Sequence, residues 1–257
     1  QALNFFELAF RENAAVDNRP GVAQSYNSIG KVYLAVGDID TAERSFQSAY
    51  EIAVRLDDAR LRLQSATNLG EAALRRGDTS LAMELFEEAL ANRTDASDPA
   101  DLAILFHNIG TVHSRNGAFG AAEESLRQAQ ELNAQIGQLI ELSANHYMLA
   151  SVFSRQERLD EALAEAGRAL DIDKQIENSV GIAADLKALG LISRKAGDLD
   201  ASYDYLKRSL YVVAAVGLSG EAEGVLTALQ EVATELGREA DAADYLRQLE
   251  ELQASAR

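Results

Sequence analysis

The chain has 257 residues, of which 47% are hydrophobic, and it carries a formal net charge of −17. That charge disfavours general binding to nucleic acids or anionic membranes, which depends on clustered lysine and arginine. The sequence contains no cysteine, which excludes disulfides and thiolate chemistry, and it has no apolar run of the roughly 18 residues that a transmembrane helix needs.

The first residues already follow a pattern that returns later in the chain. Ala2, Phe6 and Ala9 stand one 40-residue period before the triplet that begins with Ala42. We therefore expect residues 1–18 to form the second helix of a repeat whose first helix is missing, in a segment cut from a longer protein. No signal-peptide layout is present in these residues, and we expect a cytoplasmic protein.

The first complete unit, residues 19–58, predicts two helices. Asn18 is a suitable N-cap and Pro20 suits the first helical turn. Gly37 can end the helix because glycine adopts positive φ cheaply, and Asp38 can cap the next helix. Apolar residues at helical spacing predict one buried face on each helix: Ala23, Tyr26, Ile29 and Tyr33 on the first, and Ala42, Phe46, Ala49 and Ile52 on the second.

The same pattern recurs every 40 residues, which is typical of an array of stacked units. The pair Ile29-Gly30 returns as Leu69-Gly70, Ile109-Gly110, Leu149-Ala150, Leu189-Gly190 and Leu229-Gln230. Glycine marks the turn in every unit except at Glu157. The period predicts an all-α fold of antiparallel helix pairs, with repeats at about 19–58, 59–98, 99–138, 139–178, 179–218 and 219–257.

Small residues recur in each pair because two helices can approach closely only where side chains are short. We expect replacement of Gly110 or Ala122 by a large residue to cost a few kcal/mol through overpacking.

These residues resemble the tetratricopeptide repeat, whose pattern is matched here by Tyr26, Ile29-Gly30, Tyr33, Gly37, Ala42, Phe46 and Ala49. The resemblance covers the whole chain and implies a single right-handed α-solenoid over residues 1–257. The 40-residue unit is similar to that of the kinesin light chain and Pins/LGN class, and of bacterial tetratricopeptide signalling proteins. In that class the first helices line a concave groove that binds peptides.

The resemblance implies that asparagines in this groove bind the backbone of an extended peptide. Asn68 and Asn108 occupy the matching position, and Asn27 lies one residue out of register. The alternative is that Asn68 and Asn108 are solvated amides on a helix surface.

A column of cations stands five residues after the repeated pair, at Arg75, Arg115, Arg155 and Lys195. The resemblance places this column on the groove wall, where it could attract an acidic segment, because the arginine fork pairs well with carboxylates. The alternative is that these cations offset the dipole at the end of each first helix.

Two further groove positions are expected to set side-chain preference along a bound peptide, or else to form an ordinary polar surface. They hold Lys31 at one position, and His107, Tyr147 and Lys187 at the other.

No catalytic, cofactor-binding or metal-binding pattern is found in the sequence. The preferred function is a non-catalytic protein-interaction scaffold that binds an extended, acidic peptide segment. Two alternatives remain open: a peptide- or domain-sensing segment of a larger bacterial regulator, and a structural array that self-associates into a homo-oligomer through its ends.

Overall fold

In the computed structural model, the structure describes residues 2–94 and 96–255. Gln1, Asp95, Ala256 and Arg257, which fall within the predicted repeat boundaries, lie outside the described residues. Over the described ranges the fold consists of thirteen helices: α1 (Ala2–Ala15), α2 (Arg19–Ala35), α3 (Ile39–Leu56), α4 (Ala59–Arg76), α5 (Thr79–Ala91), α6 (Pro99–Arg115), α7 (Phe119–Ile136), α8 (Leu139–Arg155), α9 (Leu159–Gln175), α10 (Ser179–Lys195), α11 (Leu199–Val216), α12 (Ser219–Glu235) and α13 (Glu239–Ser255).

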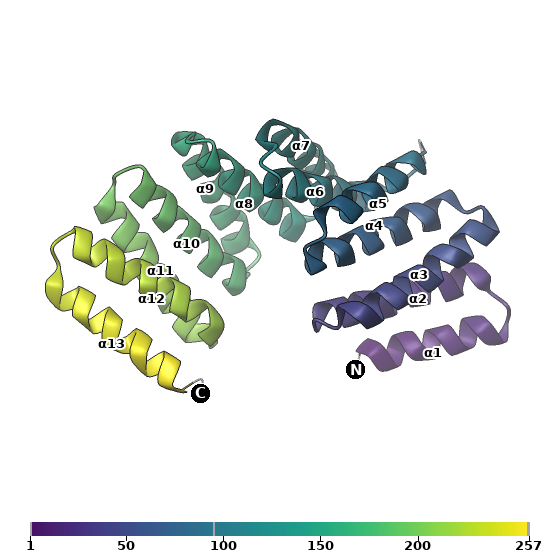
Figure 1. The fold of residues 1–257 in the computed structure, drawn as a ribbon, viewed down its shortest axis with the longest axis horizontal. Helices are drawn as coiled ribbons and strands as arrows, with labels where there is room; N and C mark the ends of the chain where they lie inside the picture. The colour runs from purple at the N-terminus through teal and green to yellow at the C-terminus, as the bar shows by residue number, and fades with distance from the viewer. Residues whose placement is uncertain (1, 95, 256–257) are drawn as a thin grey trace. The chain divides into compact units, whose positions relative to one another are not determined.

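Helix α1 is followed by six antiparallel pairs, from α2–α3 to α12–α13 (Figure 1). The prediction of an all-α array of helix pairs with a leading half-repeat is thereby confirmed. The chain divides into two compact units, Gln1–Leu132 and Asn133–Arg257, called unit 1 and unit 2 below. A single solenoid over the whole chain stays a prediction.

The predicted helix starts are confirmed by their hydrogen bonds. The Asn18 side chain accepts from the backbone N–H of Gly21, and Asp38 accepts from that of Thr41 at 3.1 Å. Asp98 caps α6 in the same way. Each bond satisfies one of the N–H groups that an α-helix leaves without a partner in its first turn.

The turn between the helices of a pair requires a left-handed residue. Gly37 has a φ of 83°, and Glu157, the one departure from glycine, has a φ of 61°. The same backbone conformation is therefore retained where the glycine is lost, although a side chain makes it less favourable.

The glycine inside each first helix lets the second helix approach. A Cβ atom added to Gly30 would lie 2.4 Å from Cε1 of Phe46, and one added to Gly70 would lie 2.3 Å from Cε1 of Phe86. Both phenylalanine rings are fully buried. The expected close approach is confirmed, and its cause is an aromatic ring that lies directly over the glycine.

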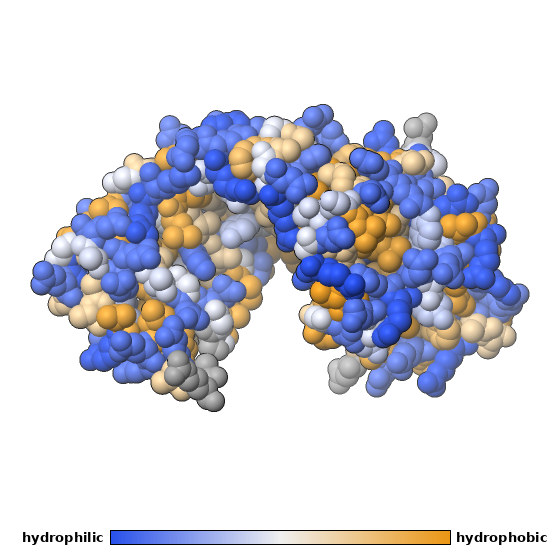
Figure 2. Space-filling view, viewed as in Figure 1, coloured by the Kyte–Doolittle hydropathy of each residue, from blue (hydrophilic) through white to orange (hydrophobic). Residues whose placement is uncertain are grey.

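Successive repeats meet where the second helix of one packs against the first helix of the next, as α3 does on α4 and α9 does on α10, and their first helices also approach each other. Cα atoms of α4 come within 8 Å of those of α2 and α6, and α10 makes the same approach to α8 and α12. Within the described residues, α3 and α5 make no such approach to each other, nor do α9 and α11. Each unit therefore has an inner wall of even-numbered helices and an outer wall of odd-numbered helices, the latter more widely spaced. Figure 2 shows a largely hydrophilic surface, with a hydrophobic area over α4 and α5 in unit 1.

Candidate functional site

A polar pocket of about 350 Å³ lies on the inner wall of unit 1, between α2 and α4. We call it the inner pocket. It contains three of the predicted site residues, namely Asn27, Lys31 and Asn68. Its full lining is Gln24, Asn27, Ser28, Lys31, Arg60, Gln64 and Asn68.

The two asparagines of the inner pocket are joined by a hydrogen bond. Asn68 Nδ2 donates to Asn27 Oδ1 at 3.1 Å, and Asn27 Nδ2 donates to Ser65 Oγ at the same distance. All three residues are buried. The interpretation of Asn68 as a solvated surface amide is therefore wrong. Asparagine is a poor helix former, and its presence in the middle of α4 is explained by the hydrogen bond through which it links the first helices of two repeats.

Asn108 lies one repeat further along the inner wall, on α6, and its hydrogen bonding differs from that of Asn68. It is only 8% exposed, so it is not a solvated amide either. Its Nδ2 has no hydrogen-bond partner among the described residues. A buried donor without an acceptor costs about 1–3 kcal/mol, and a carbonyl oxygen supplied from outside the chain would recover that cost.

Cations border the inner pocket without an acidic residue in its lining. Lys31 and Arg60 are both exposed, one on each side of the pocket. Behind Arg60, Gln64 Nε2 donates to Asp101 Oδ2 at 2.8 Å, and Arg60 Nε lies 3.9 Å from the same oxygen. Burial raises the pKa of the Asp101 carboxyl. Arg60 Nη2 also lies 3.8 Å from Asp98 Oδ2, so two carboxylates outside the lining partly offset the charge of Arg60, while the charged groups of the lining itself are Lys31 and Arg60.

The predicted basic column makes contacts within the chain. Arg115 Nη1 donates at 2.8 Å to the backbone carbonyl of Leu74, in the last turn of the preceding first helix α4. Lys195 Nζ donates equivalently to the carbonyl of Ser154 in α8, and it pairs with Glu157 Oε1 at 2.8 Å. Arg75 pairs with Glu71 in its own helix at 3.4 Å. These contacts support the helix-end interpretation in a specific form, because two cations serve the helix of the repeat before their own.

The remaining predicted residues are distributed over both units. His107 is half-buried on α6 in unit 1. Arg155 is exposed at the end of α8 in unit 2. Tyr147, also on α8, has a raised pKa, chiefly through burial and then through the charges of Asp185 and Glu221. The Lys187 ammonium on α10 packs beside Gly224 of α12. A Cβ atom added to Gly224 would lie 2.7 Å from Lys187 Nζ.

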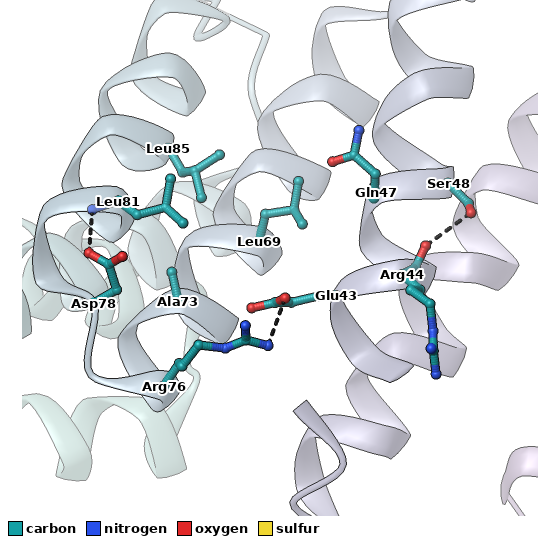
Figure 3. A pocket seen from close by; sticks show the side chains of 10 residues that line it. All are labelled: Glu43, Arg44, Gln47, Ser48, Leu69, Ala73, Arg76, Asp78, Leu81 and Leu85. Atoms are coloured by element: carbon teal, nitrogen blue, oxygen red, sulfur yellow. Dashed lines mark hydrogen bonds and ion pairs between the residues drawn. The ribbon is translucent and has the colours of Figure 1, made fainter. Parts of the chain in front are cut away.

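A second, larger pocket of about 670 Å³ lies on the outer wall of unit 1, between α3 and α5 over α4 (Figure 3). Leu69, Leu81 and Leu85 point into it from α4 and α5 (Figure 3). Its cation Arg76 is held by Asp40 at 2.7 Å and by Glu43 at 2.9 Å. The sequence analysis did not predict this pocket, because it assigned peptide binding to the groove lined by the first helices.

Residues 2–94 and 96–255 contain no group of three or more His, Cys, Asp and Glu side chains placed to hold a metal ion. Over the same ranges, none of the helices combines the length and the apolar character that crossing a membrane requires.

Comparison with known proteins identifies one family. The sequence profile of the family described as tetratricopeptide repeat matches residues 21–95 and 101–175, which is more than half of the chain. No curated protein sequence matches it.

Several solved structures share the fold. BtubC (BKLC) from P. vanneervenii has a TM-score of 0.73 and 19% identity, over 85% of this chain and 90% of BtubC. A Rap protein solved with competence and sporulation factor has a TM-score of 0.71 and 15% identity, over 98% and 70% of the two chains. A signal transduction ATPase with a tetratricopeptide repeat sensor, from Pyrococcus horikoshii, has a TM-score of 0.74 and 13% identity, over 93% of this chain and 38% of the ATPase. At these identities the likeness is one of fold.

Proposed function

The chain belongs to the tetratricopeptide repeat family, whose members are typically protein-interaction scaffolds, and we propose that it is a non-catalytic module that binds an extended acidic protein segment along the inner wall of unit 1. The binding surface would run from the inner pocket between α2 and α4 to Asn108 on α6.

The observation that carries this proposal is the unpartnered amide of Asn108. Because its Nδ2 is already removed from water, an incoming backbone carbonyl gains a hydrogen bond without a further desolvation cost on the protein side. A backbone carbonyl is available in any peptide segment, which fits a protein ligand better than a small apolar molecule.

The cations of the inner pocket supply the preference for acidic segments. Lys31 and Arg60 would pair with carboxylates, while the hydrogen-bonded Asn27 and Asn68 hold the pocket floor in a fixed geometry. In the basic column, Arg115 of unit 1 contributes to the positive potential while it remains bonded to the end of α4.

The test is capture of a partner from the natural host by the wild type and by Lys31→Glu, followed by photo-crosslinking from a benzoylphenylalanine placed at Ser28, which lines the pocket. The expected result is a partner that the wild type captures and Lys31→Glu loses, crosslinked through an acidic stretch.

Arg44→Glu is the matched control, since Arg44 is an exposed cation of the outer wall. Equal capture by the wild type and Lys31→Glu, or loss with Arg44→Glu instead, would move the binding surface away from the inner pocket and contradict the proposal.

A further inference from the structure

A third pocket, of about 370 Å³, lies on the outer wall of unit 2, between α9 and α11 over α10. We call it the basic outer pocket. Its floor is apolar, formed by Ile182 and the buried Leu186 of α10 with the half-buried Val212 of α11. Tyr211, 76% exposed, stands at its edge. A large aromatic side chain so exposed is costly to leave in water and suited to a binding surface.

All the charged residues of this lining are cations: Lys174, Lys207 and Arg208. That is unusual on a chain of net charge −17. By contrast, the outer pocket of unit 1 contains Glu43 and Asp78 beside its two arginines, and Arg76 is paired there.

The cations of the basic outer pocket are weakly neutralised. Lys207 Nζ lies 5.5 Å from the centre of the Tyr203 ring, and the Arg208 guanidinium carbon lies 5.5 Å from the centre of the Tyr205 ring. Neither has a carboxylate within ion-pair distance in the part of the chain that the structure describes. Lys174 has only the exposed Asp171 at 3.8 Å. Two charges on aromatic faces therefore remain available for a partner's carboxylates.

Comparison of equivalent positions in the repeats shows that the exposed aromatic residue of this pocket is not found in the other units. The position of Tyr211 holds Glu51, Glu131, Asp171 and Glu251 in four other units. The position of Lys207 holds Gln47, Glu87, Arg127, Gly167 and Arg247 in the other units. The aromatic residue is therefore particular to this repeat, whereas cations recur at the positions of Lys207 and Arg208, as Arg127, Arg168 and Arg247 show.

We propose that the basic outer pocket is a second docking site, separate from the inner wall, for an acidic protein segment with one bulky apolar side chain. The apolar side chain would lie on Leu186 and Val212 against Tyr211, and flanking carboxylates would pair with Lys207 and Arg208. Charge complementarity selects this occupant over a second copy of the chain, whose own net charge is strongly negative.

The experiment is panning of a phage-displayed library of random 12-residue peptides on the wild-type chain, with counter-selection on Tyr211→Glu. That variant installs the residue that three other units carry at this position, and the position is exposed, so the helix is preserved; circular dichroism checks this. Selected peptides are synthesised with a fluorophore and measured by anisotropy.

The expected result is enrichment of peptides with aspartate or glutamate around a leucine, phenylalanine or tyrosine. Their affinity should fall at least tenfold with Tyr211→Glu and with the double variant Lys207→Gln, Arg208→Gln. Lys31→Glu, in the inner pocket, should leave it unchanged, so failure of the proposed function would not affect this result.

Absence of enrichment would overturn the proposal, and so would selected peptides of basic or uncharged composition. Two further results would replace the occupant and thus overturn it. One is binding to phosphatidylserine vesicles that Tyr211→Glu abolishes in the absence of peptide binding. The other is self-association that the same variant abolishes in sedimentation.

Discussion

Arg115 donates a hydrogen bond to the carbonyl oxygen of Leu74, and it thereby joins the last turns of two successive first helices. The bond is charge-assisted, and it adds a second donor to a carbonyl in the last turn of α4 that also accepts from the backbone N–H of Gly77. Lys195 repeats the arrangement on Ser154 in unit 2.

This contact predicts that Arg115→Met destabilises the chain by about 1–2 kcal/mol, because methionine keeps much of the apolar stem and removes the donor. Arg75→Met is the control: within the described residues Arg75 pairs with Glu71 of its own helix, and its replacement should cost at most about 0.5 kcal/mol. Urea denaturation followed by circular dichroism measures both, and equal losses would show that the interhelical bond adds nothing.

The close packing at Gly70 predicts a loss of stability on substitution, because a methyl group there would lie 2.3 Å from Cε1 of the buried Phe86. Gly70→Ala should cost about 1–3 kcal/mol through overpacking. Gly167→Ala in α9, where an added Cβ meets no atom within 4 Å, should instead stabilise by up to about 1 kcal/mol. Calorimetry of the two variants should therefore give shifts of opposite sign in Tm.

Asp185 predicts a pH dependence of stability. It is buried on α10, and burial together with the adjacent Asp173 raises its pKa to about 8. Between the ordinary carboxyl pKa and about 8, the folded chain binds more protons at this site than the unfolded chain. Stability should therefore fall as the pH rises through that window and level off above it.

Asp185→Asn should be the more stable protein at pH 8 and should lack this part of the decline between pH 5 and 8. The measurement is the free energy of unfolding at several pH values for both proteins. Parallel curves would mean that Asp185 is ionised in the folded state at neutral pH.

The inner pocket predicts that partner binding depends on ionic strength. Lys31 and Arg60 are exposed, so salt should screen their attraction for carboxylates, and affinity should fall several-fold between 50 mM and 500 mM sodium chloride. Lys31→Gln should bind more weakly at low salt and show a flatter dependence. Titration calorimetry with the crosslinked acidic stretch as a synthetic peptide provides the comparison, and unchanged salt dependence would argue against steering by Lys31.

Much of the fold could be predicted because it is specified locally. Asn18 and Asp38 cap the helices that their positions indicated, and Gly30 and Gly70 lie under the bulky residue 16 positions later. The 40-residue period shows which positions are equivalent, and residues at equivalent positions adopt the same local structure.

The site could be predicted only in part, because the position of a residue in the repeat does not show where its side chain points or which group it hydrogen-bonds. The spacing of Arg115 indicated a helix end, but not that its bond goes to the preceding repeat at Leu74. Asn68 and Asn108 share a position in the pattern, yet Nδ2 of Asn68 donates to Asn27, whereas Nδ2 of Asn108 has no hydrogen-bond partner among the described residues. The outer pockets depend on the spacing between helices of different repeats, and in sequence their only signal is a local exception such as Leu81 or Tyr211.

The wider spacing of the outer helices has a consequence for how such a chain can diversify. Residues of the inner wall are constrained by the neighbouring repeat, as the bond between Asn27 and Asn68 shows. The slots between α3 and α5 and between α9 and α11 are held open by the backbone itself, so their rims can change with little cost to folding. Exposed side chains such as the one at position 211 can therefore be exchanged one repeat at a time, while the hydrogen bonds that join the inner helices stay intact.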